Sequence, residues 1–221
     1  MSSVQRLHEA VVNLAIKEGR KPGTLGHRRA GNYIVECLHS IGLEPYSGDS
    51  YRLPFNVSGF EGLNIAALAA GINETLSPLL IGAHYDSFIE APCADDNAAA
   101  VAIVLEIALG LVTRPIDRDV VIAFFDSEEA PYTGSPAMGS LHFLNNQVNN
   151  RGIACAIIQD LTGHDVKFPI KGKYRRLPRI RNLLFMTGAE SHPDLVTATN
   201  QCRRLWRLPL IAIQNHYLGD V

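Results

Sequence analysis

Residues 79–86, LLIGAHYD, and residues 120–129, VVIAFFDSEE, determine the fold of this chain. Each begins as a short apolar run and ends abruptly in polar side chains, which is typical of a strand buried on both faces. Similar runs span 64–70, 154–159 and 183–186, and helical patterns span 95–111, 135–145 and 193–205. Alternating strands and helices predict an α/β fold of three layers, α/β/α, with a mostly parallel central sheet and helices on both faces.

Two amphipathic segments, 4–17 and 27–41, precede the first strand and predict helices that pack against the sheet. Gly42 follows the second segment, as expected of a residue that ends a helix. The basic, proline-containing stretch 169–181 predicts a surface loop.

The composition predicts one globular domain over residues 1–221. The chain has 20 Lys and Arg against 22 Asp and Glu, so it lacks the basic excess that a nucleic-acid partner requires. The apolar segment 98–112 contains Glu106 and is too short to cross a bilayer, so no membrane partner is expected. Four widely spaced cysteines predict reduced thiols, and the N-terminus lacks the apolar stretch of a secretory signal, which favours a cytoplasmic location. The oligomeric state cannot be predicted.

Charged side chains follow three of the strands at the point where each one ends. They are His84 and Asp86 after the first quoted run, Glu128 and Glu129 after the second, and Asp160 after 154–159, while Asp95-Asp96-Asn97 precedes an apolar helix. Because ligands bind at the carboxyl ends of parallel strands, these side chains are expected to share one edge of the sheet.

Metal binding explains this clustering better than local structure does. Asp95 or Asp96 alone would more commonly cap a helix. Several carboxylates at one edge would repel one another without a cation. The donors are oxygen and imidazole nitrogen without thiolate, which favours catalytic zinc, although manganese or cobalt would also suit such a site.

Spacing suggests how the roles divide. His84 and Asp86 are two residues apart, so in a continuing strand they share a face and Asp86 can hydrogen-bond the ring nitrogen that does not bind metal. Glu128 and Glu129 are adjacent and cannot easily both bind one ion, so one is expected to be a ligand and the other to transfer a proton.

The order and spacing of the motifs resemble those of a known family. The matching segments are PGTLGH (22–27), GAHYDS (82–87), ADDNAAA (94–100), FDSEEAP (125–131), MGS (138–140) and QDLTG (159–163). Together they are similar to the co-catalytic zinc exopeptidases of metallopeptidase family 28, which includes bacterial leucyl aminopeptidases and glutamate-carboxypeptidase-like enzymes. The resemblance covers nearly the whole chain and implies the phosphorylase/hydrolase-like fold of zinc exopeptidases.

The resemblance also implies an activity and a set of residues. The activity is hydrolysis of the first peptide bond of a peptide with a free N-terminus, at a dinuclear zinc site. His84 and Asp160 would hold one zinc, Glu129 the other, and Asp95 would bridge both. Glu128 would be the general base and Asp86 would orient His84. A cis peptide bond between Asp95 and Asp96 is implied as well.

One ligand of the family's second zinc has no counterpart here. It is a histidine in a late Ser-Asp-His segment, and this chain stops at NHYLGDV (215–221), a stretch that precedes that segment in related sequences. The resemblance therefore implies a chain that lacks its C-terminal strand, helix and last ligand, so activity is not expected of it as it stands. By position, His216 is expected to be a loop histidine short of the true ligand, and whether it can replace that ligand stays open.

Two other functions stay open at this point. Glutaminyl cyclases resemble the same family and work with one catalytic zinc, so the number of bound ions would distinguish them from the peptidases. A non-catalytic binding module of the same fold is the third possibility, and it usually loses its ligands. The side-chain preference of a peptidase would depend on loops that the sequence does not reveal.

Overall fold

The structure, a computed structural model, describes residues 1–162 throughout. Beyond them it describes 168–170, 173–175, 184–189, 197–198, 201 and 210–215. The chain divides into two compact units, Met1–Gly163 and His164–Val221. Each unit is considered by itself.

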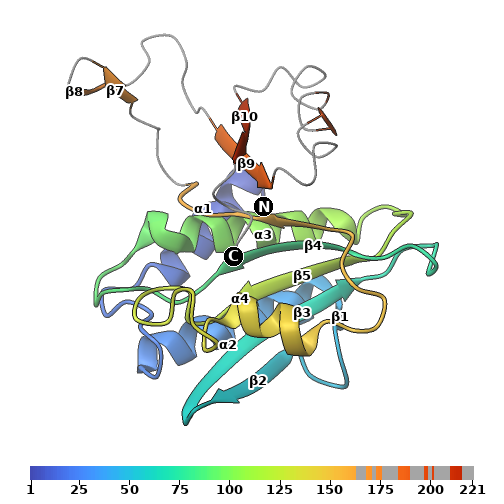
Figure 1. Cartoon of the computed structure of the whole chain (residues 1–221), viewed down its shortest axis with the longest axis horizontal. Helices are drawn as coiled ribbons and strands as arrows, with labels where there is room; N and C mark the ends of the chain where they lie inside the picture. The colour runs from blue at the N-terminus through green and yellow to red at the C-terminus, as the bar shows by residue number, and fades with distance from the viewer. Residues whose placement is uncertain are drawn as a thin grey trace. The chain divides into compact units, whose positions relative to one another are not determined.

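The first unit contains the candidate site and most of the described elements (Figure 1). Its helices are α1 (Ser3–Leu14), α2 (Leu25–Ile41), η1 (Ala94–Ala98), α3 (Ala99–Leu111), α4 (Gly139–His142) and η2 (Phe143–Gln147), where η marks a π-helical turn. Its strands are β1 (Glu44–Pro45), β2 (Arg52–Val57), β3 (Phe60–Ala69), β4 (Leu79–His84), β5 (Val120–Phe125) and β6 (Cys155–Ile158).

The six strands form one mixed sheet in the order β1-β3-β5-β4-β6, with β2 also paired to β3. β4 runs parallel to β5 and β6, whereas β3 runs antiparallel to β1, β2 and β5. The α/β class is confirmed, and the parallel part of the sheet is the part that carries the predicted site. In the antiparallel part, β2 and β3 form a hairpin. Ser58 and Gly59 join them in a tight turn, in which their φ angles are positive at 51° and 86°.

Helices cover both faces of the sheet, which confirms the three-layer arrangement. Alternate strand residues such as Ile65, Ile122 and Phe124 pack in one core with α1, α2 and α3. Their neighbours, among them Val121 and Phe125, face the opposite way and pack on Phe143 of η2. The two-residue period of a strand therefore distributes apolar side chains to both layers.

The second helix, α2, ends where its sequence predicts, whereas α1 ends at Leu14 and not at 17. The Thr24 side chain accepts a hydrogen bond from the His27 backbone at the start of α2, and Gly42 ends that helix with φ 86°. The helix expected over 135–145 is shorter, because residues 131–137 form turns and helical structure begins at Gly139. Gly139 lies where a β-carbon would collide with the Asp126 carbonyl, so this contact with the end of β5 requires glycine.

In the second unit the structure describes mainly strands. β9 (Leu184–Ala189) pairs in parallel with β10 (Leu210–Asn215), which confirms the strand predicted over 183–186. β7 (Phe168–Ile170) and β8 (Lys173–Arg175) form an antiparallel pair, so the loop predicted over 169–181 is wrong for these residues. Pro169 weighed against a strand, yet each strand of a two-stranded pair has a free edge, where proline is tolerated.

Two other predictions fall largely outside the described residues. The helix over 193–205 is described only at 197, 198 and 201, which are helical, and His216 is not described. Within the described part of the chain, no helix is long and apolar enough to span a membrane.

Candidate metal centre

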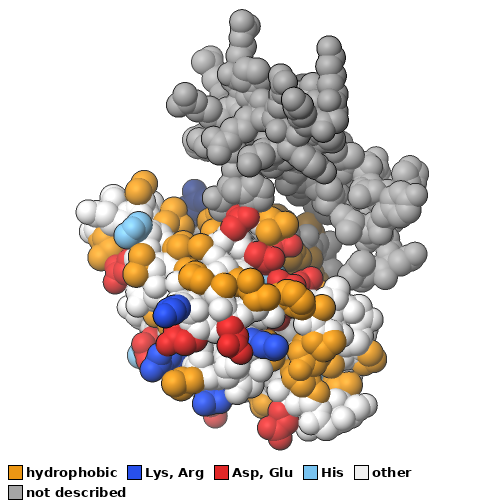
Figure 2. Space-filling model, turned by 90° about the vertical axis from the view of Figure 1, so that its left-hand side faces the viewer, with side chains coloured by type: hydrophobic (Ala, Val, Ile, Leu, Met, Phe, Trp, Pro, Cys, Tyr) orange, Lys and Arg blue, Asp and Glu red, His pale blue; other side chains and the backbone are white. Residues whose placement is uncertain are grey.

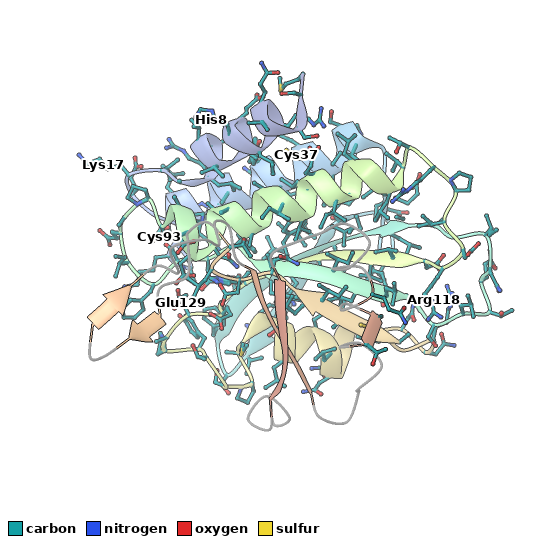
Figure 3. The ribbon with its side chains drawn as sticks, turned by 90° about the horizontal axis from the view of Figure 1, so that it is seen from above. His8, Lys17, Cys37, Cys93, Arg118 and Glu129 are labelled. Atoms are coloured by element: carbon teal, nitrogen blue, oxygen red, sulfur yellow. The ribbon has the colours of Figure 1, made fainter. Side chains whose placement is uncertain are left out.

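The parallel pairing of β4 and β5 brings their polar ends together. His84, the last residue of β4, is in register with Phe125, the last residue of β5. The Tyr85 amide then donates to the Phe125 carbonyl at 3.0 Å, so the pairing continues one residue further. Figure 3 shows Glu129 and Cys93 at this end of the sheet and Arg118 at the opposite end. Figure 2 looks onto this end, where acidic side chains gather beside hydrophobic ones.

Three side chains converge as one possible ligand group. His84, Asp96 and Glu129 each offer one ligand atom, and these atoms all lie within 4.8 Å of one another. The Nε2 atom of His84 is 3.1 Å from Asp96 Oδ1 and 3.6 Å from Asp160 Oδ1. The same nitrogen is 4.0 Å from Glu128 Oε2. One imidazole nitrogen is therefore surrounded by carboxylates from three separate segments.

His84 lies deeper than the acids around it. Its side chain is 4% exposed, whereas those of Asp96 and Asp160 are 44% and 51% exposed. The ring nitrogen thus forms the floor of the site, and the carboxylates rise from it toward the surface. A ligand approaching from solvent meets the carboxylates first.

Asp86 fixes both the imidazole and the loop that carries the two glutamates. The side chain is completely buried, and its Oδ1 lies 3.3 Å from His84 Nδ1. The same carboxylate accepts hydrogen bonds from the backbone amides of Glu128 at 3.1 Å and Glu129 at 3.2 Å. Asp86 therefore leaves the Nε2 atom of His84 free to face the acids, and it sets where the glutamate loop begins.

We expect Asp86→Asn to weaken zinc binding by about 10- to 100-fold, because an amide can no longer accept every bond that the carboxylate accepts. Competition with a chromophoric zinc chelator measures the affinity. Asp49→Asn is the matched control, since Asp49 is an exposed aspartate distant in sequence from every residue of the site. Unchanged zinc affinity in Asp86→Asn would contradict this role.

The charges of the site are those of a cation-binding group. Burial by itself lowers the pKa of His84, but hydrogen bonds to Asp160, Asp86 and Asp96 outweigh burial and raise it to about 12. Burial and then the charge of Asp96 raise the pKa of Glu129 to about 7. Burial also raises the pKa of Glu128. The acids therefore stabilise a positive charge at the His84 ring, and a divalent cation would supply it better than a proton.

Zinc binding should consequently release protons. At neutral pH the raised pKa keeps the His84 ring protonated, and the ring must lose that proton to become a ligand. Protons then compete with the metal, so affinity rises with increasing pH and falls as pH decreases. Calorimetric titration in two buffers of different ionisation enthalpy measures the release, and a binding enthalpy that is the same in both buffers would contradict it.

Asp96 belongs to the converging group, whereas the family resemblance implied Asp95 as the bridging ligand. The hydrogen bond to His84 lowers the pKa of Asp96. Asp96 Oδ1 lies 3.1 Å from His84 Nε2, and the ligand atoms of Asp96 and Glu129 lie within 4.8 Å of each other. The cis peptide bond likewise lies one residue later than predicted, between Asp96 and Asn97. The sequence prediction assumed a regular helix start, whereas the backbone at Asp96 and Asn97 is not helical. Which of two adjacent aspartates faces His84 depends on that kink.

Asn97 connects this kink to the strand that delivers Asp160. Its side chain is buried and donates from Nδ2 to the Gln159 carbonyl at 3.0 Å. The residue before Asp160 is thereby held beside the residue after Asp96. No role was predicted for Asn97 from the sequence, although its place directly after the two aspartates could have indicated that it supports the site.

A turn at Ser127 separates the hydrogen bonds of Asp126 from the two glutamates at the metal centre. Asp126 is buried and bonds to His27 Nε2 at 2.8 Å and to the Leu63 amide at 2.8 Å. Ser127 has a φ angle of 56°, which is unusual for a residue with a side chain, and its hydroxyl donates to Asp126. The chain reverses here, so Asp126 supports the fold while Glu128 and Glu129 face the metal centre.

A separate cavity of about 810 Å³ lies against α2, β2 and β3. The side chains that characterise it are His27, Arg28, Arg29, Arg52, Tyr85 and Asp126. None of the three converging ligands lines it, so it is distinct from the metal centre.

Comparison with known proteins agrees with this geometry. The model of peptidase family M28 matches residues 64–179, which include every residue of the cluster. The chain therefore belongs to peptidase family M28, and its class is that of the zinc metallopeptidases.

Two relatives and two solved structures illustrate the match. The chain is 39% identical over 80 residues to a vacuolar membrane protease of Schizosaccharomyces japonicus, covering 36% of this chain and 9% of the relative. It is 32% identical over 125 residues to the "Probable lipoprotein aminopeptidase LpqL" of Mycobacterium tuberculosis, covering 54% of this chain and 25% of that relative. This chain thus corresponds to a small part of either protein.

The solved structures share the fold at low sequence identity. A glutaminyl cyclase of Porphyromonas gingivalis superposes with a TM-score of 0.70 at 22% identity, over 97% of this chain and 75% of that one. A Zn-dependent exopeptidase of Parabacteroides distasonis gives a TM-score of 0.69 at 19% identity, over 99% of this chain and 85% of that one.

Proposed function

We propose that this chain carries the metal centre of a zinc-dependent exopeptidase that removes the N-terminal residue of a peptide. The observation that carries the proposal is the convergence of His84, Asp96 and Glu129. The Glu128 carboxylate lies 4.0 Å from His84 Nε2, and the Glu128 backbone amide donates to Asp86. Nitrogen and oxygen donors without sulfur fit catalytic zinc. A zinc ion held there would polarise a carbonyl oxygen and lower the pKa of a water molecule.

Asp96 is positioned to serve two ions. Its carboxylate lies 3.1 Å from His84 Nε2 and within 4.8 Å of the Glu129 ligand atom, and Asp160 lies 3.6 Å from the same His84 nitrogen. We therefore assign His84 and Asp160 to one zinc, Glu129 to the other, and Asp96 to both. This division retains the predicted dinuclear arrangement and replaces only the bridging residue.

Glu128 is the general base of the proposed reaction. Its carboxylate reaches the centre, while its backbone is fixed by Asp86 and by the Thr133 hydroxyl, which donates to the Glu128 carbonyl at 2.6 Å. Burial raises its pKa and so brings it closer to neutrality, where a carboxylate can both take and return a proton. In the proposed step, a Glu128 oxygen takes a proton from the attacking water and gives it to the leaving amine.

A free N-terminus fits the charge of the site. The substrate's α-amino group is a cation near neutral pH, and the carboxylate of Glu128, which is not assigned as a metal ligand, would attract it. A peptide whose amino group is acetylated lacks that charge. The enzyme should therefore cleave aminoacyl-nitroanilides and leave their N-acetyl analogues intact.

The experiment combines metal analysis with this pair of substrates. Plasma mass spectrometry measures zinc in the chain and in a version extended by the C-terminal segment of a family relative. We expect the extended protein to hydrolyse the free aminoacyl-nitroanilide only, and we expect this activity to be lost on chelation and restored by zinc. Zinc-independent activity, or absence of zinc binding in both proteins, would overturn the proposal.

A glutaminyl cyclase is the second candidate, favoured by the likeness to the Porphyromonas gingivalis structure. That reaction closes an N-terminal glutamine on itself and releases ammonia without consuming water. Incubation with a glutaminyl peptide separates the two candidates, since cyclisation lowers the peptide mass by 17 Da (the mass of ammonia) whereas hydrolysis liberates free glutamine.

A further inference from the structure

Arg20 is a fully buried arginine that no step of the proposed reaction uses. It lies in the connection between α1 and α2, far in sequence from the metal centre. An arginine has five N–H donors in a planar fork, and a buried one is costly unless all of them are satisfied. What satisfies them here is unusual, because every acceptor is a backbone carbonyl rather than a carboxylate.

Five carbonyl oxygens accept from the guanidinium. Nε donates to Tyr85 at 2.9 Å, Nη1 to Leu14 and Pro92 at 2.9 Å each, and Nη2 to Cys93 at 3.0 Å and Asp96 at 3.3 Å. The backbone of Arg20 is held as well, since its amide donates to Ser87 Oγ at 2.7 Å and its carbonyl accepts from the Ser87 amide at 3.2 Å.

Four of these five carbonyls belong to two segments that deliver metal ligands. Tyr85 lies between His84 and Asp86, at the end of β4. Pro92, Cys93 and Asp96 lie in the loop and turn that precede α3, where Cys93 has a positive φ of 42° and Asp96 leaves the helical conformation. The guanidinium thus spans the gap between the His84 backbone and the Asp96 backbone, which no regular hydrogen-bond ladder connects.

We propose that Arg20 is a positioning residue, which fixes the separation of the His84 and Asp96 ligands and thereby sets the affinity and geometry of the metal centre. This inference rests on the proposed metal-dependent function. Lysine keeps the charge of Arg20, but its three donors radiate from one nitrogen and cannot reproduce the five bonds that the planar guanidinium makes from three nitrogens. The separation of the ligands should then relax even though the net charge is unchanged.

The test is cobalt titration of Arg20→Lys, because the visible absorption of Co²⁺ depends on its coordination geometry. We expect affinity to fall by about 10- to 100-fold, the usual loss when a residue behind a metal ligand is changed, and the absorption spectrum to shift. Thermal unfolding, followed by circular dichroism, measures the stability of each variant beside its affinity.

Arg151→Lys is the matched control. Arg151 bonds to Asp119 and to the Leu76 carbonyl, and Asp119 directly precedes β5 at the end of the sheet opposite the metal centre. The substitution should lower the melting temperature and leave cobalt affinity and spectrum unchanged. A purely structural role for Arg20 would make the two variants behave alike.

Each outcome has a definite meaning. Cobalt binding by the wild-type chain, with weaker binding and an altered spectrum in Arg20→Lys only, supports the inference. If Arg20→Lys folds and binds as wild type does, the inference is overturned while the proposed function stands. If wild-type protein binds no cobalt or zinc, the proposed function fails first and the inference fails with it.

A milder variant covers the case in which Arg20→Lys does not fold. Ser87→Ala removes the hydroxyl that accepts from the Arg20 amide and leaves the guanidinium in place. It should weaken cobalt binding in the same direction but to a smaller degree. Wild-type affinity in a folded Ser87→Ala protein would then count against the inference.

Discussion

Glu128→Gln, made in the extended protein, should lower the rate of aminoacyl-nitroanilide hydrolysis by about 10²- to 10⁴-fold while zinc content stays unchanged. An amide of the same shape cannot take a proton from water, so the step assigned to Glu128 stops. The ligand group of His84, Asp96 and Glu129 is untouched by the change, which is why the metal should remain. Activity is measured at several substrate concentrations, because the loss is expected in kcat rather than in KM.

Two comparisons make this result specific. Glu61→Gln alters an exposed glutamate on β3 and should keep full activity. Glu129→Gln changes the neighbouring residue and should lose zinc together with activity, since Glu129 is assigned as a ligand. If Glu128→Gln lost zinc and Glu129→Gln kept it, the two roles would have to be exchanged.

Asp96→Asn should have the second large effect, a loss of zinc affinity greater than the roughly 10- to 100-fold that an outer residue such as Asp86 contributes. Asp96 lies close to both other members of the ligand group, so its charge and both of its oxygens matter. Removing it leaves the His84 ring without the acid that lies 3.1 Å from Nε2. Zinc stoichiometry and competition with a chelator measure the effect.

Asp95→Asn is the matched partner of this variant, because it removes the same charge one residue earlier. It should retain zinc affinity within a few-fold of wild type. The pair of variants decides directly between the bridging residue that the family resemblance suggested and the one that the structure brings to His84. A large loss of zinc in Asp95→Asn with little loss in Asp96→Asn would refute the assignment.

Much of the site was predictable because it depends on local sequence. Apolar runs that end in polar residues identified β4, β5 and β6, and parallel pairing of these strands places their ends together without further information. The two-residue spacing of His84 and Asp86 was enough to suggest their contact, which the structure shows at 3.3 Å. The donor types alone indicated a cation rather than an organic cofactor.

The antiparallel direction of β3 was harder to predict from the sequence. Its apolar run resembles those of the parallel strands, so the pattern of residues gives no direction. The hairpin at Ser58 and Gly59 determines it, and a serine with positive φ is a weak signal in sequence. The prediction of a mostly parallel sheet therefore holds for β5, β4 and β6 and not for the antiparallel edge.

By itself, then, the sequence determined the layers of the fold, the end of the sheet that binds metal and the chemical kind of its ligands, because periodicity and strand ends are local properties. Only the tertiary structure decided which aspartate faces His84 and what Arg20 does. Both depend on contacts between distant segments: the bonds from Arg20 to Tyr85 and Asp96 cross 65 and 76 residues of chain. No pattern within one segment encodes such distances, so they became visible only once the backbone had brought the segments together.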